Sequence, residues 1–251
     1  MAAFAMTPSI QRRCNALIAL HALHFSGHAA VAITQDQLLL NLVSQQIRLA
    51  EPELDAEAVS KRANTRAARV LGLVQALGPG MGALIVSPIV GGLADAYGRR
   101  WMTLAAPLGL ALARLNLAWR PSVKAFVFYR VAMGPLGILM GRAILLARAD
   151  MVPGHTLAFA KEVARQAQVN LALGLVTTRL GSWLASRADK VGPDRALADS
   201  FALAGLINIA AMVGAFWLMA ETLPRASRIP FSFRTSNPLS FVSFFGRSRM
   251  L

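Results

Sequence analysis

The stretch Gly91-Gly-Leu-Ala-Asp95-Ala-Tyr-Gly98-Arg99-Arg100 lies between two apolar segments of a 251-residue chain. Glycines around an aspartate and a pair of arginines favour close helix approach, a turn with positive φ and a charge pair at the level of lipid head groups. On its own, the arginine pair is also typical of a simple positive anchor at the membrane surface. The two interpretations differ in whether Asp95 has a role.

The composition favours lipid as the surrounding solvent. Hydrophobic residues make up 55% of the chain, charged residues make up 15%, and the mean hydropathy is +0.50. Soluble domains carry about 25% charged residues, so this chain has too few charges to coat a soluble exterior. At about 20 apolar residues for each span, the length allows roughly six or seven helices and excludes twelve.

Six apolar segments are predicted to span the membrane as an all-α bundle. Residues 14–35, 70–94 and 200–220 are uncharged and exceed the roughly 18 residues that mark a span. Residues 101–119, 125–147 and 166–186 are interrupted by arginine. An arginine at mid-membrane costs about 3 kcal/mol, so it must face the bundle or water.

This pattern predicts a cytoplasmic tail over residues 1–13 and a six-helix bundle over residues 14–224. Residues 37–69 are predicted to form a polar loop with a short helix outside the bilayer. Residues 225–251 are predicted to form a basic cytoplasmic tail that approaches a missing seventh helix. Six spans place both termini on one side, and the basic residues near the span ends favour the cytoplasm for that side.

Several functional classes are disfavoured by the residues present. A single cysteine, Cys14, excludes an internal disulfide and a cysteine-built metal site. The net charge of +14 is spread beside apolar segments, which disfavours a nucleic-acid interface. No catalytic or nucleotide-binding motif is visible, so neither an enzyme nor a cofactor is predicted. Arg12 and Arg13 precede the first acidic residue, Asp36, which leaves an organellar presequence as an alternative.

Residues 91–100 resemble the signature G-x-x-x-D-R-x-G-R-R of the major facilitator superfamily. Gly91, Asp95, Gly98, Arg99 and Arg100 match its residues, although alanine stands at position 96 where the family often has arginine. Residues 130–137, Arg-Val-Ala-Met-Gly-Pro-Leu-Gly, resemble the fourth-helix motif, and residues 149–153 resemble its end. Residues 220–224, Ala-Glu-Thr-Leu-Pro, resemble the close of the sixth helix.

The resemblance implies the amino-terminal half of a twelve-helix fold, built from two inverted three-helix repeats. It implies a secondary transporter of a small solute, most similar to the drug:proton antiporter and tetracycline-resistance branch, although residues 173–182 lack the proline of the antiporter motif. The bilayer, a solute with or without a coupled proton, and a second six-helix half would be its partners. That half is either missing from a truncated chain or supplied by a homodimer. A non-transporting scaffold or regulatory remnant is the alternative.

The resemblance also implies roles for individual residues. Asp95, Arg99 and Asp150 would form a cytoplasmic clasp. Arg130, followed by Gly134, would take part in proton coupling, or it would act as a structural tether.

Further polar residues lie within the apolar spans. His21, His24 and His28 lie on one helical face. They could act as proton carriers or as ligands of a soft metal ion, or they could form a polar stripe along the transport pathway. The candidate pathway or packing residues are Gln75, Gln168, Asn170 and Asn208. The arginines that could favour an anionic substrate, unless they are paired or snorkel, are Arg114, Arg142 and Arg179.

Overall fold

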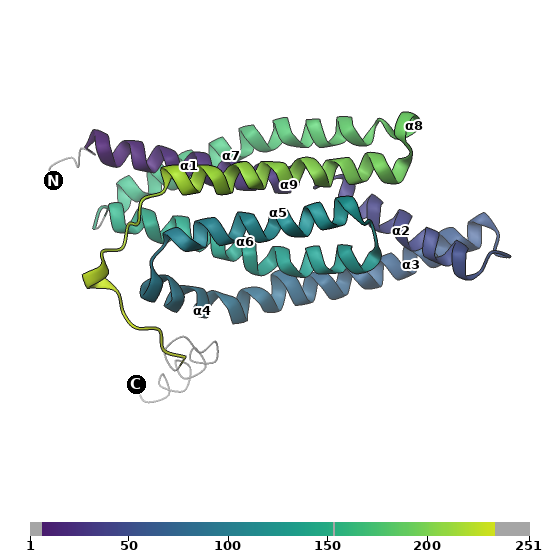
Figure 1. Ribbon diagram of the computed structural model, residues 1–251, viewed down its shortest axis with the longest axis horizontal. Helices are drawn as coiled ribbons and strands as arrows, with labels where there is room; N and C mark the ends of the chain where they lie inside the picture. Colours follow the sequence, from purple (N-terminus) through teal and green to yellow (C-terminus); the bar gives the residue numbers. More distant parts are fainter. Residues whose placement is uncertain (1–6, 153, 234–251) are drawn as a thin grey trace.

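The computed structural model describes residues 7–152 and 154–233, and the elements in this part of the chain are helices (Figure 1). The elements in order are α1 Pro8–Ala29, α2 Thr34–Ala50, α3 Ala56–Gln75, the π-helix η1 Ala76–Met81, α4 Gly82–Tyr97, α5 Arg100–Trp119, α6 Val123–Met151, α7 Thr156–Ala185, α8 Ala188–Val191, α9 Pro193–Leu218 and the 3-10 helix η2 Arg225–Ser227. The predicted approach to a seventh helix lies outside the described residues.

The long helices run side by side along the longest axis of the molecule (Figure 1). The start of α1, the turn between α4 and α5 and the end of α9 lie at one end, and the turn between α2 and α3 lies at the other. Within the bundle, α5 packs along both α6 and α9, and α1 packs along both α7 and α9. The α4–α5 turn and the α2–α3 turn therefore face opposite ends of the bundle.

Local sequence explains where these helices begin and change direction. The side chain of Thr7 caps α1 by accepting a hydrogen bond from the amide of Ile10 at 3.4 Å. The side chain of Asp55 caps α3 by accepting one from the amide of Ala58 at 2.7 Å. Proline at position 79 has no amide hydrogen to donate, and the helix widens to the π form around it.

The buried core consists of two clusters. One contains residues of α2, α3, α5, α6 and α9, including Leu39, Phe126 and Phe201. The other contains residues of α1, α4, α5, α6 and α9, including Leu17 and Met140. Since α5, α6 and α9 contribute to both clusters, they hold the two ends of the bundle together.

Residues 37–69 lie almost wholly within α2 and α3, which differs from the predicted polar loop with one short helix. Their charges lower the mean hydropathy, but Leu39, Val43 and Ile47 recur at helical spacing and are buried. Val59 and Ala63 do the same on α3. Amphipathic helices of this kind are stabilised by packing one face, which a count of uncharged residues does not detect. In addition, α1 begins at Pro8, within the predicted tail.

Among the described residues, four helices are long and apolar enough to cross a membrane: Pro8–Ala50, Arg100–Trp119, Val123–Met151 and Pro193–Leu218. The first of these combines α1 and α2, and the apolar stretch of α4, Ile85–Tyr97, is shorter than a full span. The helices confirm the prediction of an all-α fold, and four of them are candidate membrane spans, whereas the number six remains a prediction.

Candidate functional site

A cluster of charges around the buried Arg99 occupies the turn between α4 and α5. The side chain of Arg99 is only 5% exposed, and its Nη1 lies 2.9 Å from Oδ1 of Asp95, one helical turn earlier. Its Nε lies 3.3 Å from Oδ2 of Asp150, near the end of α6. One guanidinium therefore joins two carboxylates from two helices, and we call Asp95, Arg99 and Asp150 the Arg99 cluster.

The segment after α9 completes this cluster through Glu221. Its carboxylate accepts hydrogen bonds from the backbone amides of Arg99 at 2.9 Å, Arg100 at 3.4 Å and Leu223 at 3.0 Å. It also lies 3.6 Å from Nη2 of Arg228. Partial burial alone would raise the pKa of Glu221, but the amides and the Arg228 guanidinium outweigh it and hold the pKa below its usual value. The sequence assigned residue 221 to a motif without giving it this role.

The same segment also contacts Asp150 and Asp95. The hydroxyl of Thr222 donates to Oδ2 of Asp150 at 3.0 Å, and the amide of Ile229 donates to the carbonyl of Asp95 at 3.1 Å. The chain that follows α9 thus holds the ends of both α4 and α6.

The other motif residues have separate places near the Arg99 cluster. Gly98 has a φ of +98°, as the glycine pattern predicts, and a Cβ there would overlap the carboxylate of Glu221. Gly91 has no such neighbour. Nη2 of Arg100 donates to the carbonyl of Phe216 at 2.9 Å, and its guanidinium lies 5.6 Å from the centre of the Phe216 ring. Arg100 therefore joins α5 to α9 and is more than a positive anchor.

A second polar group lies deep between α1, α5 and α9, around the fully buried Arg114. Its guanidinium lies 3.0 Å from Nδ1 of His28, donates to Oδ1 of Asn208 and lies 5.6 Å from the centre of the Tyr129 ring. The ring of His24 meets that of His28 edge to face at 5.1 Å. The sequence proposed these histidines and Arg114 separately, and the structure brings them together.

A groove of about 600 Å³ between α1 and α7 joins two of the predicted pathway residues. His28 and Asn170 line it together with Phe25, Leu171 and Thr178. His21 lies beside Asn170, since its Nδ1 is 3.0 Å from the Asn170 amide nitrogen and 2.6 Å from that of Gln166. The groove therefore has an apolar wall with a few polar groups, as is usual for sites that bind small molecules.

Arg130 and Gln75 form a third group, between α2, α3 and α6. Nη1 of Arg130 donates to Gln35 at 2.9 Å, and Nη2 donates to Gln75 at 3.2 Å. Gly134 is buried one turn further along α6. These residues do not line the groove that contains His28 and Asn170, so the predicted pathway set divides into two places.

The remaining candidates do not join these groups. Gln168, Arg142 and Arg179 are exposed, and the latter two lie on α6 and α7. Within the described part of the chain, no group of three or more histidine, cysteine or acidic side chains is placed to hold a metal ion. The described residues therefore offer no further histidine, cysteine or acidic ligand for a soft metal ion at the histidine stripe.

Comparison with known proteins shows a likeness of fold to a solved structure. No family model matches the chain, and no curated protein matches it. The crystal structure of the human organic anion transporter MFSD10 (TETRAN) has a TM-score of 0.67 with this chain at 18% sequence identity. The match covers 96% of this chain and 56% of that one, so the chain spans little more than half the length of that transporter. The chain thus has helices that are apolar and long enough to cross a membrane, and its fold is similar to that of this transporter.

Proposed function

We propose that this chain forms one six-helix half of a secondary transporter that moves a small solute by alternating access. The Arg99 cluster is the observation that carries the proposal. Transporters with this kind of fold work by rocking two bundles about a central site, so a set of ion pairs at one end can stabilise one of the two states. Removing a carboxylate leaves the buried Arg99 guanidinium less well compensated, which would raise the free energy of the state that the cluster holds closed.

The groove between α1 and α7 is the proposed solute pathway. His28 and Asn170 offer polar contacts there, and Arg114 lies directly behind His28. A buried cation beside a groove favours a solute with negative charge. The structural likeness to an organic anion transporter is consistent with an organic anion as the solute.

Arg130 is proposed as a structural tether. It contacts the neutral amides of Gln35 and Gln75, so it connects α6 to α2 and α3. A proton-coupling role would call for a carboxylate beside it, and none is found among its described partners. This geometry favours the tether over the coupling role implied by the resemblance.

A second helical bundle is part of the proposal, because the chain spans 56% of the transporter that it resembles. That bundle comes from further residues of the same polypeptide or from a second copy of the chain. Crosslinking in the native membrane would distinguish the two sources, since only the second gives a dimer of this chain.

The test is transport of a fluorescent organic anion into vesicles that contain the purified protein. We expect Asp95→Asn and Asp150→Asn to reduce the initial rate at least about tenfold, because each removes one carboxylate from Arg99. A tenfold reduction in rate corresponds to an increase of about 1.4 kcal/mol in the activation free energy. Membrane insertion should be unchanged. Arg142→Gln is the matched control, since Arg142 is an exposed charge on the same helix as Asp150.

Unimpaired transport by Asp95→Asn would contradict the gating role of the cluster. Absence of transport of any tested anion by the unaltered protein, with its second bundle present, would favour the scaffold alternative.

A further inference from the structure

The hairpin formed by α2 and α3 projects from the end of the bundle opposite the Arg99 cluster (Figure 1). Helix α1 has 22 residues and is therefore roughly 33 Å long at 1.5 Å per residue. This is about the thickness of the hydrocarbon core, which is roughly 30 Å. If α1 spans the membrane, much of α2 and α3 lies outside the hydrocarbon, where exposed charges meet water.

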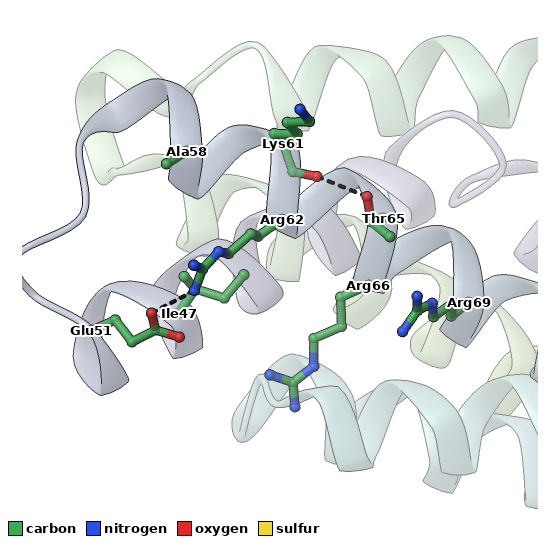
Figure 2. A pocket seen from close by; sticks show the side chains of 8 residues that line it. All are labelled: Ile47, Glu51, Ala58, Lys61, Arg62, Thr65, Arg66 and Arg69. Atoms are coloured by element: carbon green, nitrogen blue, oxygen red, sulfur yellow. Dashed lines mark hydrogen bonds and ion pairs between the residues drawn. The ribbon is translucent and has the colours of Figure 1, made fainter.

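One face of α3 in this hairpin is strongly basic. Lys61, Arg62, Arg66 and Arg69 line a pocket of about 660 Å³ together with Glu51 and three other residues (Figure 2). Positions 58, 61, 62, 65, 66 and 69 recur at intervals of three and four, so they share one face of the helix.

The opposite face of α3 holds these cations in place. Val59 and Ala63 are buried in the core cluster that also contains Leu42 of α2. The basic residues therefore project from a helix whose other face is packed in the core.

The charges of the pocket are unbalanced. Glu51 is the only acidic residue in its lining, and it pairs with Arg62 at 2.5 Å. Across the described chain, the ammonium of Lys61 and the guanidinium groups of Arg66 and Arg69 have no hydrogen bond or ion pair. Figure 2 shows Arg66 and Arg69 without a partner among the lining residues. Like charges held within a Debye length repel one another, so an added anion would relieve this repulsion.

We propose that this pocket binds a multivalent anion that carries phosphate, sulfate or carboxylate groups. Arginine side chains bind such groups through paired, charge-assisted hydrogen bonds, and lysine adds a point charge. The volume lies within the range of about 300–1,000 Å³ that is usual for small-molecule sites. The hydroxyl of Thr65 already donates to the Lys61 carbonyl at 3.0 Å, so the cations supply the binding contacts. The inference does not depend on the proposed transport function.

The experiment measures binding of inorganic pyrophosphate to the full chain in an uncharged detergent, by calorimetry and by thermal unfolding, with sodium chloride at equal ionic strength as the reference. The triple variant Lys61→Gln, Arg66→Gln, Arg69→Gln keeps the Arg62–Glu51 pair. We expect it to weaken binding at least about threefold, because it removes three exposed cations that each contribute modestly to holding the anion. Its unfolding midpoint without pyrophosphate should not fall, because these side chains have no partner among the described residues.

Two further variants make the test specific. Glu51→Gln removes the only acid of the pocket and releases Arg62, so it should tighten binding a few-fold. Arg48→Gln should leave binding unchanged, because Arg48 is exposed on α2 but does not line the pocket.

A lipid head group and a soluble anion share this chemistry, and lipid nanodiscs distinguish them. Competition by phosphatidylglycerol that is lost in the triple variant would identify a head group, whereas pyrophosphate binding without that competition would identify a soluble anion. Equal pyrophosphate affinity in the unaltered chain, the triple variant and Arg48→Gln would overturn the proposal. Absence of any binding to the unaltered chain, by pyrophosphate and by phosphatidylglycerol alike, would also overturn it.

Discussion

Gly98 adopts a φ of +98° at the turn between α4 and α5, directly against the carboxylate of Glu221. We expect Gly98→Ala to destabilise the protein by at least about 1 kcal/mol, because L-residues disfavour this conformation and the added Cβ meets the carboxylate. For a chain of this size, the midpoint of thermal unfolding should fall by roughly 2–4 °C for each kcal/mol. The measurement is the unfolding midpoint of the detergent-purified protein.

Gly91→Ala is the matched control within the same motif. Among the described residues, a Cβ at Gly91 has no neighbour within 4 Å, and alanine is favoured over glycine in a helix by about 0.5–1 kcal/mol. We therefore expect an unchanged or raised midpoint. Equal falls in the unfolding midpoint for Gly98→Ala and Gly91→Ala would contradict the interpretation that Gly98 lies in a strained turn and Gly91 at an ordinary helical position.

Glu221 makes stability depend on pH in one direction. Its pKa in the folded protein lies below the ordinary value of 4.5, because backbone amides and Arg228 outweigh the opposing effect of partial burial. In the window just below pH 4.5, the unfolded chain therefore binds more protons than the folded protein does. The stabilisation that ionised Glu221 provides is fully present above that pH and is lost as the pH falls through the pKa of the folded state. We expect Glu221→Gln to lower the unfolding midpoint at pH 6 and above.

The difference between Glu221→Gln and the unaltered protein should shrink as the pH falls below about 4.5. Thermal unfolding at a series of pH values checks this. A difference that is constant from pH 6 to pH 3.5 would show that the charge of Glu221 is not what stabilises the turn.

The contrast between Asp95 and Glu221 shows what sequence can reveal about this site. Asp95 and Arg99 are four residues apart, so their spacing and the motif predicted the pair. Glu221 is 122 residues from Arg99, and nothing in local spacing indicates that the Glu221 carboxylate meets the Arg99 backbone amide. Long-range contacts of this kind depend on how α9 packs, which composition does not determine.

At the scale of elements, apolar run length predicted the position of α5 and most of α6 and α9 well. It did not predict α2 and α3, because these helices are held by one apolar face while the other carries charges such as Arg66. The histidine stripe of α1 was predicted from its period, but its partner Arg114 comes from α5. Periodicity therefore predicted faces of helices, and only packing showed which faces meet.

The contact between α1 and α7 depends on Gly181. A Cβ at this position would overlap the carbonyl of Ala30, just beyond the end of α1. Thr178 donates to the carbonyl of Ala29 at 3.1 Å in the same region. We expect Gly181→Ala to separate these helices and to destabilise the protein by about 1–3 kcal/mol, as overpacking does.

Thermal unfolding measures this loss, and Gly141→Ala on α6 is the control because a Cβ there has no neighbour within 4 Å in the part of the chain that the structure describes. If Gly181→Ala is as stable as Gly141→Ala, the close approach of α1 and α7 is not needed for the fold.

At the scale of the whole molecule, the two ends differ in chemistry. One end holds the Arg99 cluster, where carboxylates and guanidinium groups neutralise one another across α4, α5 and α6. The other end holds the basic pocket of the α2–α3 hairpin, where cations exceed acids. A bundle that spans the membrane must therefore present these two surfaces to opposite compartments.

Cysteine labelling tests this arrangement. In a Cys14→Ala background, Glu53→Cys places a thiol at the turn between α2 and α3, and Ser227→Cys places one beyond α9. Both positions are exposed, whereas Cys14 is fully buried. We expect a membrane-impermeant maleimide to label position 53 on intact cells and position 227 only after permeabilisation, because the count of basic residues near the predicted span ends favours the cytoplasm for that end. The unaltered protein should remain unlabelled on intact cells, and labelling of both positions from the same side would contradict a bundle that crosses the bilayer along its longest axis.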